Sequence, residues 1–529
     1  MQPKTWLAGL AVVATLAVPV YAAAQQAGGT LKLYHRGNPP SGSIHEEATY
    51  STTMPYQGVF NNLVVFNPQK DVESIENIVP DLATSWSWDG TKTKLTFKLR
   101  EGVKWHDGKP FTAKDVQCTF DLLQGKAKAK LRKNPRKSWY WNLQKVTADN
   151  DYQATMHLGQ PQPAMLALLA SGYTPIYPCH VSPKKMRTNP IGTGPFKFVE
   201  LKQNESIKFV KNEDYWKPGR PYLDGHDWTI IKSRATRVLG FIAKEFDFTF
   251  ANDISIPLLK DVNEKYSEAV CHTVPTNISL NLIVNRDKAP FDNADIRLAM
   301  ATAIDRDAFI KILFQGEGQK GGAMLPPPNG TWGMPADVLS KAAGYGDKAA
   351  DIKKAQGLMK KAGYGPDNRL AVKVSTRNIA TYRDPAVILI DQLKSIYIDG
   401  ELEPIETSNW HAKVARKDYS VGMNLTGIAV DDPDVTFFEN YACGSQRNYT
   451  GYCNKELQEL FMKQASMSDQ EARKKLVWEI DAKLQLDVAR PMIAHYNAAT
   501  CHAPKVKGFV RKKNGSYSDW RFEDIWLQQ

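Results

Sequence analysis

The stretch HEEAT at residues 45–49 opens like the zinc-binding helix of a metalloprotease. In such a helix two histidines four positions apart bind the metal, and the glutamate between them acts as a base. Thr49 stands where the second histidine belongs, so a zinc ion would lack a ligand. This stretch therefore predicts no hydrolytic centre.

A second candidate for chemistry is the stretch Ser-Pro-Lys-Lys, which gives Ser182 and Lys185 the spacing of the nucleophile motif in penicillin-interacting enzymes. Pro183 disfavours a helix interior at that point. The sequence contains no Lys-Thr-Gly or Ser-Asp-Asn partner and no Gly-x-Ser-x-Gly. A secreted hydrolase is therefore the weakest alternative, and we expect a protein that is not an enzyme.

The chain has six cysteines, and three of them are followed by histidine, at His180, His272 and His502. Their spacings fit no zinc pattern, so we predict no metal site and no cofactor. An even cysteine count in an oxidising compartment favours disulfides. Cys443 and Cys453 enclose a short polar loop and are the first predicted bridge.

Residues 1–24 have the three parts of a secretory signal peptide: Lys4, an apolar run, and small residues at the end. The alternative is an N-terminal membrane anchor, but the run is shorter than the ~20 residues that a span needs, and Pro19 interrupts it. No cysteine lies near the cleavage region, which disfavours a lipid anchor. We therefore expect a cleaved signal and a periplasmic protein.

Lys and Arg number 68 against 56 Asp and Glu, so the formal net charge is +12. Seven of the positive charges lie at residues 126–137 without an acid among them. Such a run can bind nucleic acid or an anionic membrane, but it contains no aromatic residue and is more typical of a solvated loop. We expect no nucleic-acid partner. The length predicts two or three domains.

Residues 93–105 alternate apolar and polar side chains and predict a strand with one wet face. Residues 111–123 predict a helix that begins near Thr112 and carries Asp115 in its first turn. Further along, residues 291–314 place apolar side chains on one stripe and predict a single long helix.

Residues 351–406 read as helix, strand, helix and strand, which predicts an α/β layer. The stretch IGTGPFKFVE at residues 191–200 raises the alternative of a phosphate loop. Pro195 removes a backbone donor there, and the following residues alternate like a half-buried strand. The glycine pair therefore predicts a tight turn into a strand rather than an anion site.

Six stretches together resemble the extracellular solute-binding proteins of ABC importers, family 5, whose members carry peptides, nickel, opines and other solutes. They occur in the family's order from about residue 77 to the end of the chain. The matching stretches are residues 77–116, 189–200, 291–310, 362–374, 430–461 and 503–509.

The resemblance implies an α/β, two-lobed periplasmic binding protein fold (type II, cluster C) with an extra subdomain in the first lobe. The implied boundaries are a first lobe at residues 25–274 with the subdomain at about 70–188, a second lobe at 275–495, and a return to the first lobe at 496–529. Cys271 and Cys501 then lie beside the two crossings, where they are able to pair, and Cys118 with Cys179 is the further candidate pair.

The resemblance also implies a ligand contact at Asp431, which matches the aspartate that pairs with the peptide ammonium in peptide-carrying members. The alternative is that Asp431 only caps the turn before Pro433. Three neighbours depart from the peptide pattern: Leu425, Ile428 and Asp432. Two adjacent carboxylates also suit a cationic or polyhydroxylated solute.

Further candidate ligand contacts follow from position alone. The segment after the first strand faces the cleft in the family, and Trp410 and His411 precede the helix that leads to the Asp431 loop. For any single one of these residues, a packing or surface role is the alternative. They are His35, Arg36, Ser43, His45, Glu46, Met54, Tyr56, Trp410 and His411.

We therefore expect a monomeric periplasmic component that captures a small solute, a peptide or peptide-like molecule, between two lobes and delivers it to an ABC permease. A solute that contacts both lobes only when they are closed biases the hinge toward closure without covalent chemistry. The alternative cargo is a metal complex or haem. The sequence does not identify the solute.

Overall fold

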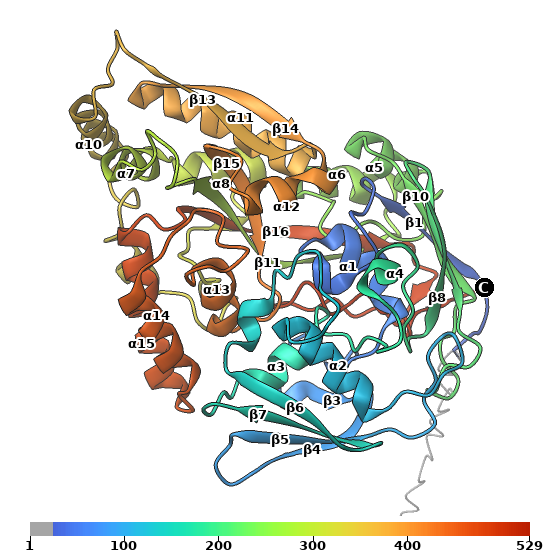
Figure 1. Cartoon of the computed structure of the whole chain (residues 1–529). Helices are drawn as coiled ribbons and strands as arrows, with labels where there is room; N and C mark the ends of the chain where they lie inside the picture. Colours follow the sequence, from blue (N-terminus) through green and yellow to red (C-terminus); the bar gives the residue numbers. More distant parts are fainter. Residues whose placement is uncertain (1–24) are drawn as a thin grey trace, which may run out of the picture.

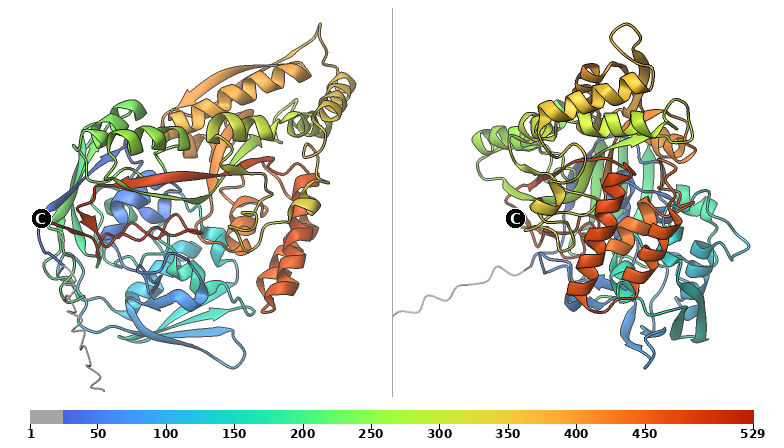
Figure 2. Two further views of the ribbon diagram at one scale, coloured as in Figure 1. Left: turned by 180° about the vertical axis from the view of Figure 1, so that it is seen from behind. Right: turned by 90° about the vertical axis from the view of Figure 1, so that its left-hand side faces the viewer.

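The computed structural model describes residues 25–529, and the predicted signal peptide at residues 1–24 lies outside the described residues. The chain forms two lobes joined by two long neighbouring strands, with a smaller sheet against the first lobe (Figure 1). Figure 2 shows from behind that the C-terminal segment returns to the edge of the first lobe.

Lobe I is built on a four-stranded sheet in the order β1-β10-β9-β8. β1 pairs with β10 in parallel, and the other neighbours are antiparallel. Leu31 and Leu33 of β1 are fully buried, because alternate side chains of a strand point into the core. The strands and associated helices are β1 (Thr30–His35), β8 (Phe196–Lys202), β9 (Ser206–Lys211), β10 (Gly225–Ile230), α1 (Tyr50–Tyr56), α5 (Arg234–Ile242) and α6 (Ile256–Lys265).

A second four-stranded sheet, β4-β5-β7-β6, is antiparallel and lies at the bottom of Figure 1. The predicted strand at residues 93–105 corresponds to β5, whose buried and more exposed residues alternate. The predicted helix is α2, and Thr112 and Asp115 form its capping box. The elements of this part are β2 (Val64–Phe66), β3 (Ile78–Pro80), β4 (Ala83–Trp88), β5 (Lys94–Leu99), β6 (Leu143–Asn150), β7 (Gln153–Leu158), α2 (Ala113–Gln124), α3 (Met165–Ala170) and α4 (Pro183–Thr188).

The turn before β8 shows why two glycines stand there. A Cβ atom on Gly192 would lie 1.8 Å from the carbonyl oxygen of Val59, and one on Gly194 would lie 2.4 Å from that of Gly58. The backbone NH of Gly194 instead donates to Val59 at 2.9 Å. The glycines permit two backbones to touch, so the predicted turn into a strand is confirmed.

Lobe II is built on a six-stranded sheet in the order β12-β16-β11-β15-β13-β14, with helices on its faces. The alternation predicted at residues 351–406 is confirmed as α10, β13, α11 and β14. The elements are β11 (Val270–Val284), β12 (Gly318–Gln319), β13 (Leu370–Arg377), β14 (Ile398–Ile405), β15 (Val421–Gly427), β16 (Met492–His502), α7 (Ala294–Ala303), α8 (Arg306–Phe314), α9 (Ala336–Leu339), α10 (Lys348–Lys361), α11 (Ala380–Leu393), α12 (Thr407–Ala415), α13 (Pro433–Asn440), α14 (Lys455–Ala465) and α15 (Gln470–Leu486); β17 (Val506–Lys507) and β18 (Trp526–Leu527) follow.

The prediction of one long helix at residues 291–314 is wrong. α7 ends at Ala303, Ile304 is extended, and Asp305 caps a new helix by accepting from the backbone NH of Ala308 at 2.9 Å. An aspartate side chain competes with the helix backbone for hydrogen bonds and so favours a cap over an interior position. The stripe of apolar residues continues across the break, so the sequence pattern does not reveal that the helix is interrupted.

Two strands carry the chain between the lobes. β11 pairs with β15 over residues 278–284 and with β16 over residues 270–281, and its register against β16 shifts between Pro275 and Ser279. Single bridges from Phe248 to Leu33 and to His502 connect the first sheet to this pair. A register shift between long paired strands provides a local bend between two otherwise regular halves.

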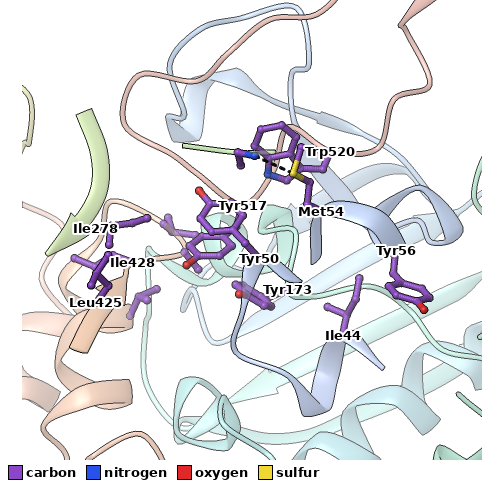
Figure 3. Packing of buried hydrophobic residues seen from close by; sticks show 14 of the residues in the cluster. Ile44, Tyr50, Met54, Tyr56, Tyr173, Ile278, Leu425, Ile428, Tyr517 and Trp520 are labelled. Carbon is purple, nitrogen blue, oxygen red and sulfur yellow. Dashed lines mark hydrogen bonds between the residues drawn. The ribbon is translucent and has the colours of Figure 1, made fainter. Parts of the chain in front are cut away.

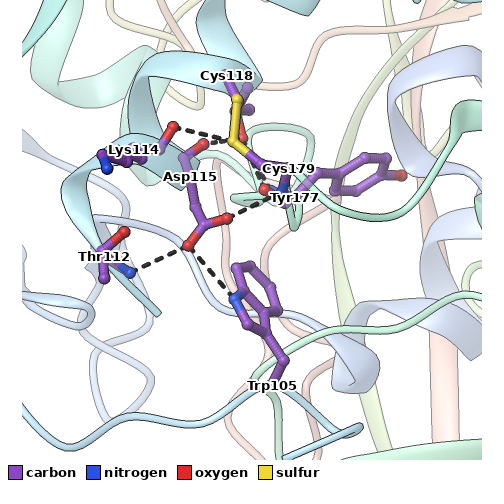
Figure 4. Close-up of a disulfide and its surroundings, with 8 residues drawn as sticks. Trp105, Thr112, Lys114, Asp115, Cys118, Tyr177 and Cys179 are labelled. Atoms are coloured by element: carbon purple, nitrogen blue, oxygen red, sulfur yellow. Dashed lines mark hydrogen bonds between the residues drawn. A yellow bond between two sulfur atoms is a disulfide. The ribbon is translucent and has the colours of Figure 1, made fainter. Parts of the chain in front are cut away.

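All six cysteines are paired, as Cys443 with Cys453, Cys271 with Cys501, and Cys118 with Cys179. The predicted bridge and both further candidate pairs are confirmed. Figure 4 shows Asp115 beside the third bridge, where it accepts from the backbone NH groups of Thr112 and Cys179 at 3.0 and 2.9 Å. One carboxylate thus fixes both the helix start and the loop that the bridge joins to it.

The basic run at residues 126–137 forms a loop apart from a short 3-10 turn at its end. Arg132 and Lys133 pair with the buried carboxylate of Glu47 at 2.9 and 2.6 Å. The backbone NH of Arg132 donates to Glu46. Arg132 and Lys133 of the basic run therefore provide partners for the two buried acids of the HEEAT stretch, Glu46 and Glu47.

Candidate ligand-binding cleft

A small cavity of about 30 Å³ lies between the lobes. Lobe I contributes the residue after β1 and the start of α1, while lobe II contributes the ends of β13 and β15. The lining residues are Arg36, Ala48, Thr49, Tyr50, Ala251, Asn252, Ile278, Arg377, Thr381, Tyr382, His411, Leu425, Gly427, Arg447, Tyr496 and Tyr517.

The polar lining is strongly cationic. Three arginines and one histidine line the cavity, and within residues 25–529 no Asp or Glu is part of its wall. A cleft lined by one sign of charge raises the local concentration of molecules of the opposite sign. The wall therefore favours an anionic group.

Arg36 follows the last residue of β1 and is 8% exposed. Its guanidinium lies over the ring of Phe250 at 4.6 Å. Among the buried arginines of residues 25–529, it alone donates no hydrogen bond, and its Nε is fully buried without a partner. Burial, and next the charge of Arg377, lower the pKa of Arg36 to about 10, so it remains charged at neutral pH.

Arg377, the last residue of β13, reaches the same cavity from lobe II and is 1% exposed. Its terminal nitrogens donate to the hydroxyls of Tyr382 and Thr407 at 2.9 and 3.0 Å, and its Nε has no partner. Neutral hydroxyls orient the guanidinium without neutralising it. Arg377 thus presents a net positive charge to the cavity.

Arg447 differs because it already has an acid. It donates to Glu439 of α13, which also accepts from the indole NH of Trp139 at 2.6 Å. The Glu439 carboxylate raises the pKa of Arg447 further above its ordinary value. This arginine is therefore already paired within lobe II, with the same carboxylate that contacts lobe I through Trp139.

His411 on α12 lines the cavity and is buried. Its Nδ1 lies 3.4 Å from the hydroxyl of Tyr449, and its Nε2 has no partner. Burial, and then the positive charges of Arg377 and Lys133, hold the pKa of His411 well below its usual range. The ring is neutral at physiological pH and offers one polar atom to a ligand.

Another part of the wall is aromatic and apolar (Figure 3). Tyr50 and Tyr517 stack with ring centroids 4.3 Å apart. On the lobe II side Ile278 and Leu425 line the cavity, and Ile428 lies next to them. An apolar wall beside a few convergent polar groups is the usual composition of a small-molecule site.

A second cavity of about 200 Å³ adjoins the first and shares four lining residues with it: Asn252, Thr381, Leu425 and Tyr496. Arg234 and Asp384 line it, together with the apolar side chains of residues 312–314. The two cavities are neighbours along the same cleft.

The lobes contact each other around this cleft. Besides the contact of Trp139 with Glu439, Gln162 donates to Asp434 at 2.9 Å, and the rings of Trp141 and Phe438 stack 4.9 Å apart. On the other side Arg234 donates to Thr381 at 2.8 Å. The structure therefore represents a closed arrangement.

Of the residues that the sequence suggested in lobe I, Arg36 lines the cavity, and six others make contacts within the lobe. Ser43 lies 3.4 Å from the Tyr177 hydroxyl, and the Glu46 carboxylate accepts from Arg187 at 3.1 Å. His35 lies 3.1 Å from the Ser51 carbonyl oxygen, and His45 lies 2.8 Å from that of Pro175.

The remaining two, Met54 and Tyr56, pack in the core of lobe I. The sulfur of Met54 accepts from the backbone NH of Ala251 at 3.2 Å. The ring of Tyr56 packs against Phe198 and Phe209.

Of those suggested in lobe II, His411 lines the cavity, and Ile428 lies beside it. Leu425, which departs from the peptide pattern, also lines the cavity. Trp410 is fully buried in a small cluster with Ile283 and Val414. The two adjacent acids lie outside both cavities.

Asp432 caps α13 and pairs with Arg473 at 2.7 Å. Asp431 accepts from the backbone NH of Thr331 at 3.3 Å, and its carbonyl oxygen accepts from the indole of Trp332. Burial raises the pKa of Asp431 to about 7. Both acids thus have partners inside lobe II.

Sequence reasoning missed Arg377, Arg447, Tyr50 and Tyr517. Arg377 directly follows the predicted strand at residues 370–376, and strand ends are where α/β folds place ligand contacts, so a signal existed. Tyr517 lies far from the other lining residues in the chain and has no local pattern.

The family described as "Bacterial extracellular solute-binding proteins, family 5 Middle" matches residues 77–448. This chain belongs to that family. As a family 5 member, this protein is the solute-binding component of an ABC importer and not an enzyme. The predicted function is confirmed at this level. Its partners are a solute and a permease, and family members are periplasmic in Gram-negative bacteria.

The glutathione-binding protein GsiB of Escherichia coli strain K12 is 26% identical over 465 residues, which cover 84% of this chain and 86% of the relative. Among solved structures, DppA from Helicobacter pylori in complex with the peptide STSA has a TM-score of 0.83 at 24% identity, over 95% of this chain and 99% of that one. AgaA from A. tumefaciens R10 with agropinic acid has a TM-score of 0.82 at 22% identity, over 95% and 99%. These two confirm the two-lobed fold.

No helix within residues 25–529 is both long enough and apolar enough to cross a bilayer. In the same part of the chain, no three His, Cys, Asp or Glu side chains gather as they would around a metal ion.

Proposed function

We propose that this family 5 protein captures a short peptide or peptide-like solute in the cleft lined by Arg36, Arg377, His411, Tyr50 and Tyr517. It acts as a monomer in the periplasm after cleavage of residues 1–24, and it delivers the solute to its permease. The lobe boundaries expected from the sequence, at residues 274/275 and 495/496, are part of this proposal.

One observation carries the proposal: the cavity is lined from both lobes, and further contacts between the lobes surround it. A solute in this position contacts both walls only when the lobes are closed. Closure then depends on the differential affinity of the solute for the closed form. The boundaries fall inside β11 and β16 near the register shift, which supports a hinge at that point.

The names of the relatives support a peptide-like solute. One relative is named for glutathione, and one structural neighbour was solved with the peptide STSA. The two adjoining cavities combine arginine side chains with aromatic and apolar walls, which is a composition suitable for molecules of this kind. The tyrosines would pack against the apolar part of the solute, and the arginines would contact its polar groups.

The test uses protein freed of retained cargo by unfolding and refolding. A library of di- and tripeptides and glutathione is screened by thermal melting, and hits are measured by small-angle scattering. We expect at least one peptide-like compound to raise the melting temperature and reduce the radius of gyration. Constant melting temperature and radius across the library would overturn the proposal.

A further inference from the structure

We propose that the cleft selects acidic solutes, because Arg36 of lobe I and Arg377 of lobe II close on a single acidic group of the ligand. This rests on the proposed function and names the chemistry of its substrate. The inference concerns the net charge of the solute and the residue pair that selects it.

The first support is that Arg36 is buried without a partner. A buried charge without a hydrogen-bonded counter-charge raises the free energy of the folded protein. Arginine cannot relieve this cost by losing its proton at physiological pH. An anionic group from the ligand would relieve it, since the side chain lines the cavity.

The second support is that two buried acids beside the first cavity, Asp253 and Glu439, are already paired. Asp253 of lobe I holds Arg237 through two bonds of 2.8 and 2.9 Å. Glu439 holds Arg447 and Trp139. No acid of the described residues lines the first cavity, so no side chain there competes with the ligand for Arg36 and Arg377.

The third support is that the two arginines come from different lobes. Closing the lobes brings two like charges toward one cavity, which disfavours closure when the cleft holds only water. An anion between the two arginines attracts both of them, so the electrostatic contribution to closure becomes favourable. Neutral or cationic solutes leave the repulsion in place, so the arginine pair makes closure depend on the charge of the cargo.

The remaining walls fit an acidic solute with an organic body. His411 is neutral and adds a polar atom without a further charge, and Tyr50 with Tyr517 supplies an apolar face. The same guanidinium pair would also hold the phosphate group of a phosphorylated compound. The experiment therefore separates a carboxylate from a phosphate.

The test measures affinity by titration calorimetry with four matched probes: Ala-Glu-Ala, its C-terminal amide, Ala-Gln-Ala amide and Ala-Lys-Ala amide. Inorganic phosphate is the fifth probe. We expect Ala-Glu-Ala to bind at least about tenfold more tightly than either amide that lacks a carboxylate. A higher affinity for phosphate than for the peptides would keep the arginine site and assign it to phosphorylated solutes.

Arg36→Gln and Arg377→Gln should each weaken Ala-Glu-Ala by about tenfold or more, and Arg36→Lys should retain more affinity than Arg36→Gln. The matched control is Arg383→Gln, because Arg383 is exposed on α11 and does not line either cavity. This control should bind Ala-Glu-Ala as the parent does. Circular dichroism melting confirms that each variant is folded.

Equal affinity for Ala-Glu-Ala and Ala-Lys-Ala amide, or unchanged affinity in both glutamine variants, would overturn the charge inference while leaving solute capture in place. Absence of closure with every probe and with the peptide library would overturn the proposed function as well. Phosphate binding that is as strong in both glutamine variants as in the parent protein would also contradict the inference.

Discussion

Arg237 and Arg36 are both buried in lobe I beside aromatic rings, but their electrostatic surroundings differ. Arg237 lies 5.6 Å from the centre of the Tyr34 ring and is held by two bonds to Asp253. Arg36 lies 4.6 Å from the Phe250 ring and has no acid partner. A buried charge that the fold has compensated is part of the framework, whereas one that it has left uncompensated marks a place for a ligand.

The largest expected effect is on the compensated arginine. Arg237→Met should lower the free energy of unfolding by about 3–5 kcal/mol, because it leaves Asp253 buried and unpaired. Arg36→Met should change the stability of the ligand-free protein by less than about 1 kcal/mol or increase it, because it removes an unpaired charge. Urea denaturation of both variants measures the difference, and equal losses would contradict the comparison.

A second prediction concerns Glu73, a buried acid without a partner, and its effect on stability at different pH values. Glu73 is 6% exposed, neither carboxylate oxygen has a partner, and burial together with Asp519 raises its pKa to about 8. An unpaired acid can take up a proton, which an arginine cannot match by losing one. Because the folded pKa lies above the unfolded one, this group costs no stability below about pH 4, and its cost grows toward pH 8.

Glu73→Gln should therefore match the parent in stability at pH 4 and exceed it by about 2 kcal/mol or more at pH 8. Denaturation at the two pH values measures this. A variant with the same pH dependence as the parent would show that Glu73 is ionised and compensated in the folded protein.

A third prediction concerns the compensated arginine of the cleft, Arg447. Trp139→Phe removes the indole donor to Glu439 and should reduce solute affinity by about tenfold, because this contact exists between the lobes. The matched control is Trp105→Phe, since the indole of Trp105 donates to Asp115 within lobe I. Calorimetry with the tightest-binding peptide of the library gives the affinities. An equal loss of affinity in Trp139→Phe and Trp105→Phe would show that the Trp139 contact has no particular role in closure.

The smallest expected effect is at Asp431. Asp431→Asn should change the affinity for Ala-Glu-Ala by less than about threefold, because its side chain contacts Thr331 and lies outside both cavities. The same titration is repeated with the N-acetylated peptide. A loss of tenfold or more with the free peptide alone would instead assign Asp431 the ammonium contact that the sequence suggested.

Much of the fold was predictable because its patterns are local. The alternation in β5, the cap at Thr112 and the helix-strand order at residues 351–406 depend on residues within one element. The break between α7 and α8 was not predicted, because a stripe of apolar residues cannot show whether one helix or two share the same core. The six family stretches add the two-lobed arrangement.

The site was less predictable, because its residues come from distant segments and no local pattern joins them. Arg36 and His411 were found from their positions, whereas Arg377 and Tyr517 reach the cavity from segments with no special composition. His35 and His45 had equally suitable side chains, yet the fold directs them to backbone carbonyls. Side-chain type was visible, but direction and partner were not.

By itself the sequence determined the compartment expected, the family resemblance, the absence of a hydrolase motif and the pairing of Cys443 with Cys453. Only the tertiary structure decided which buried charges are compensated, because a counter-charge such as Asp253 or Glu439 becomes a partner through three-dimensional proximity. Arg36 and Arg237 are the same residue type in the same lobe, and their different roles arise from what lies across from each of them.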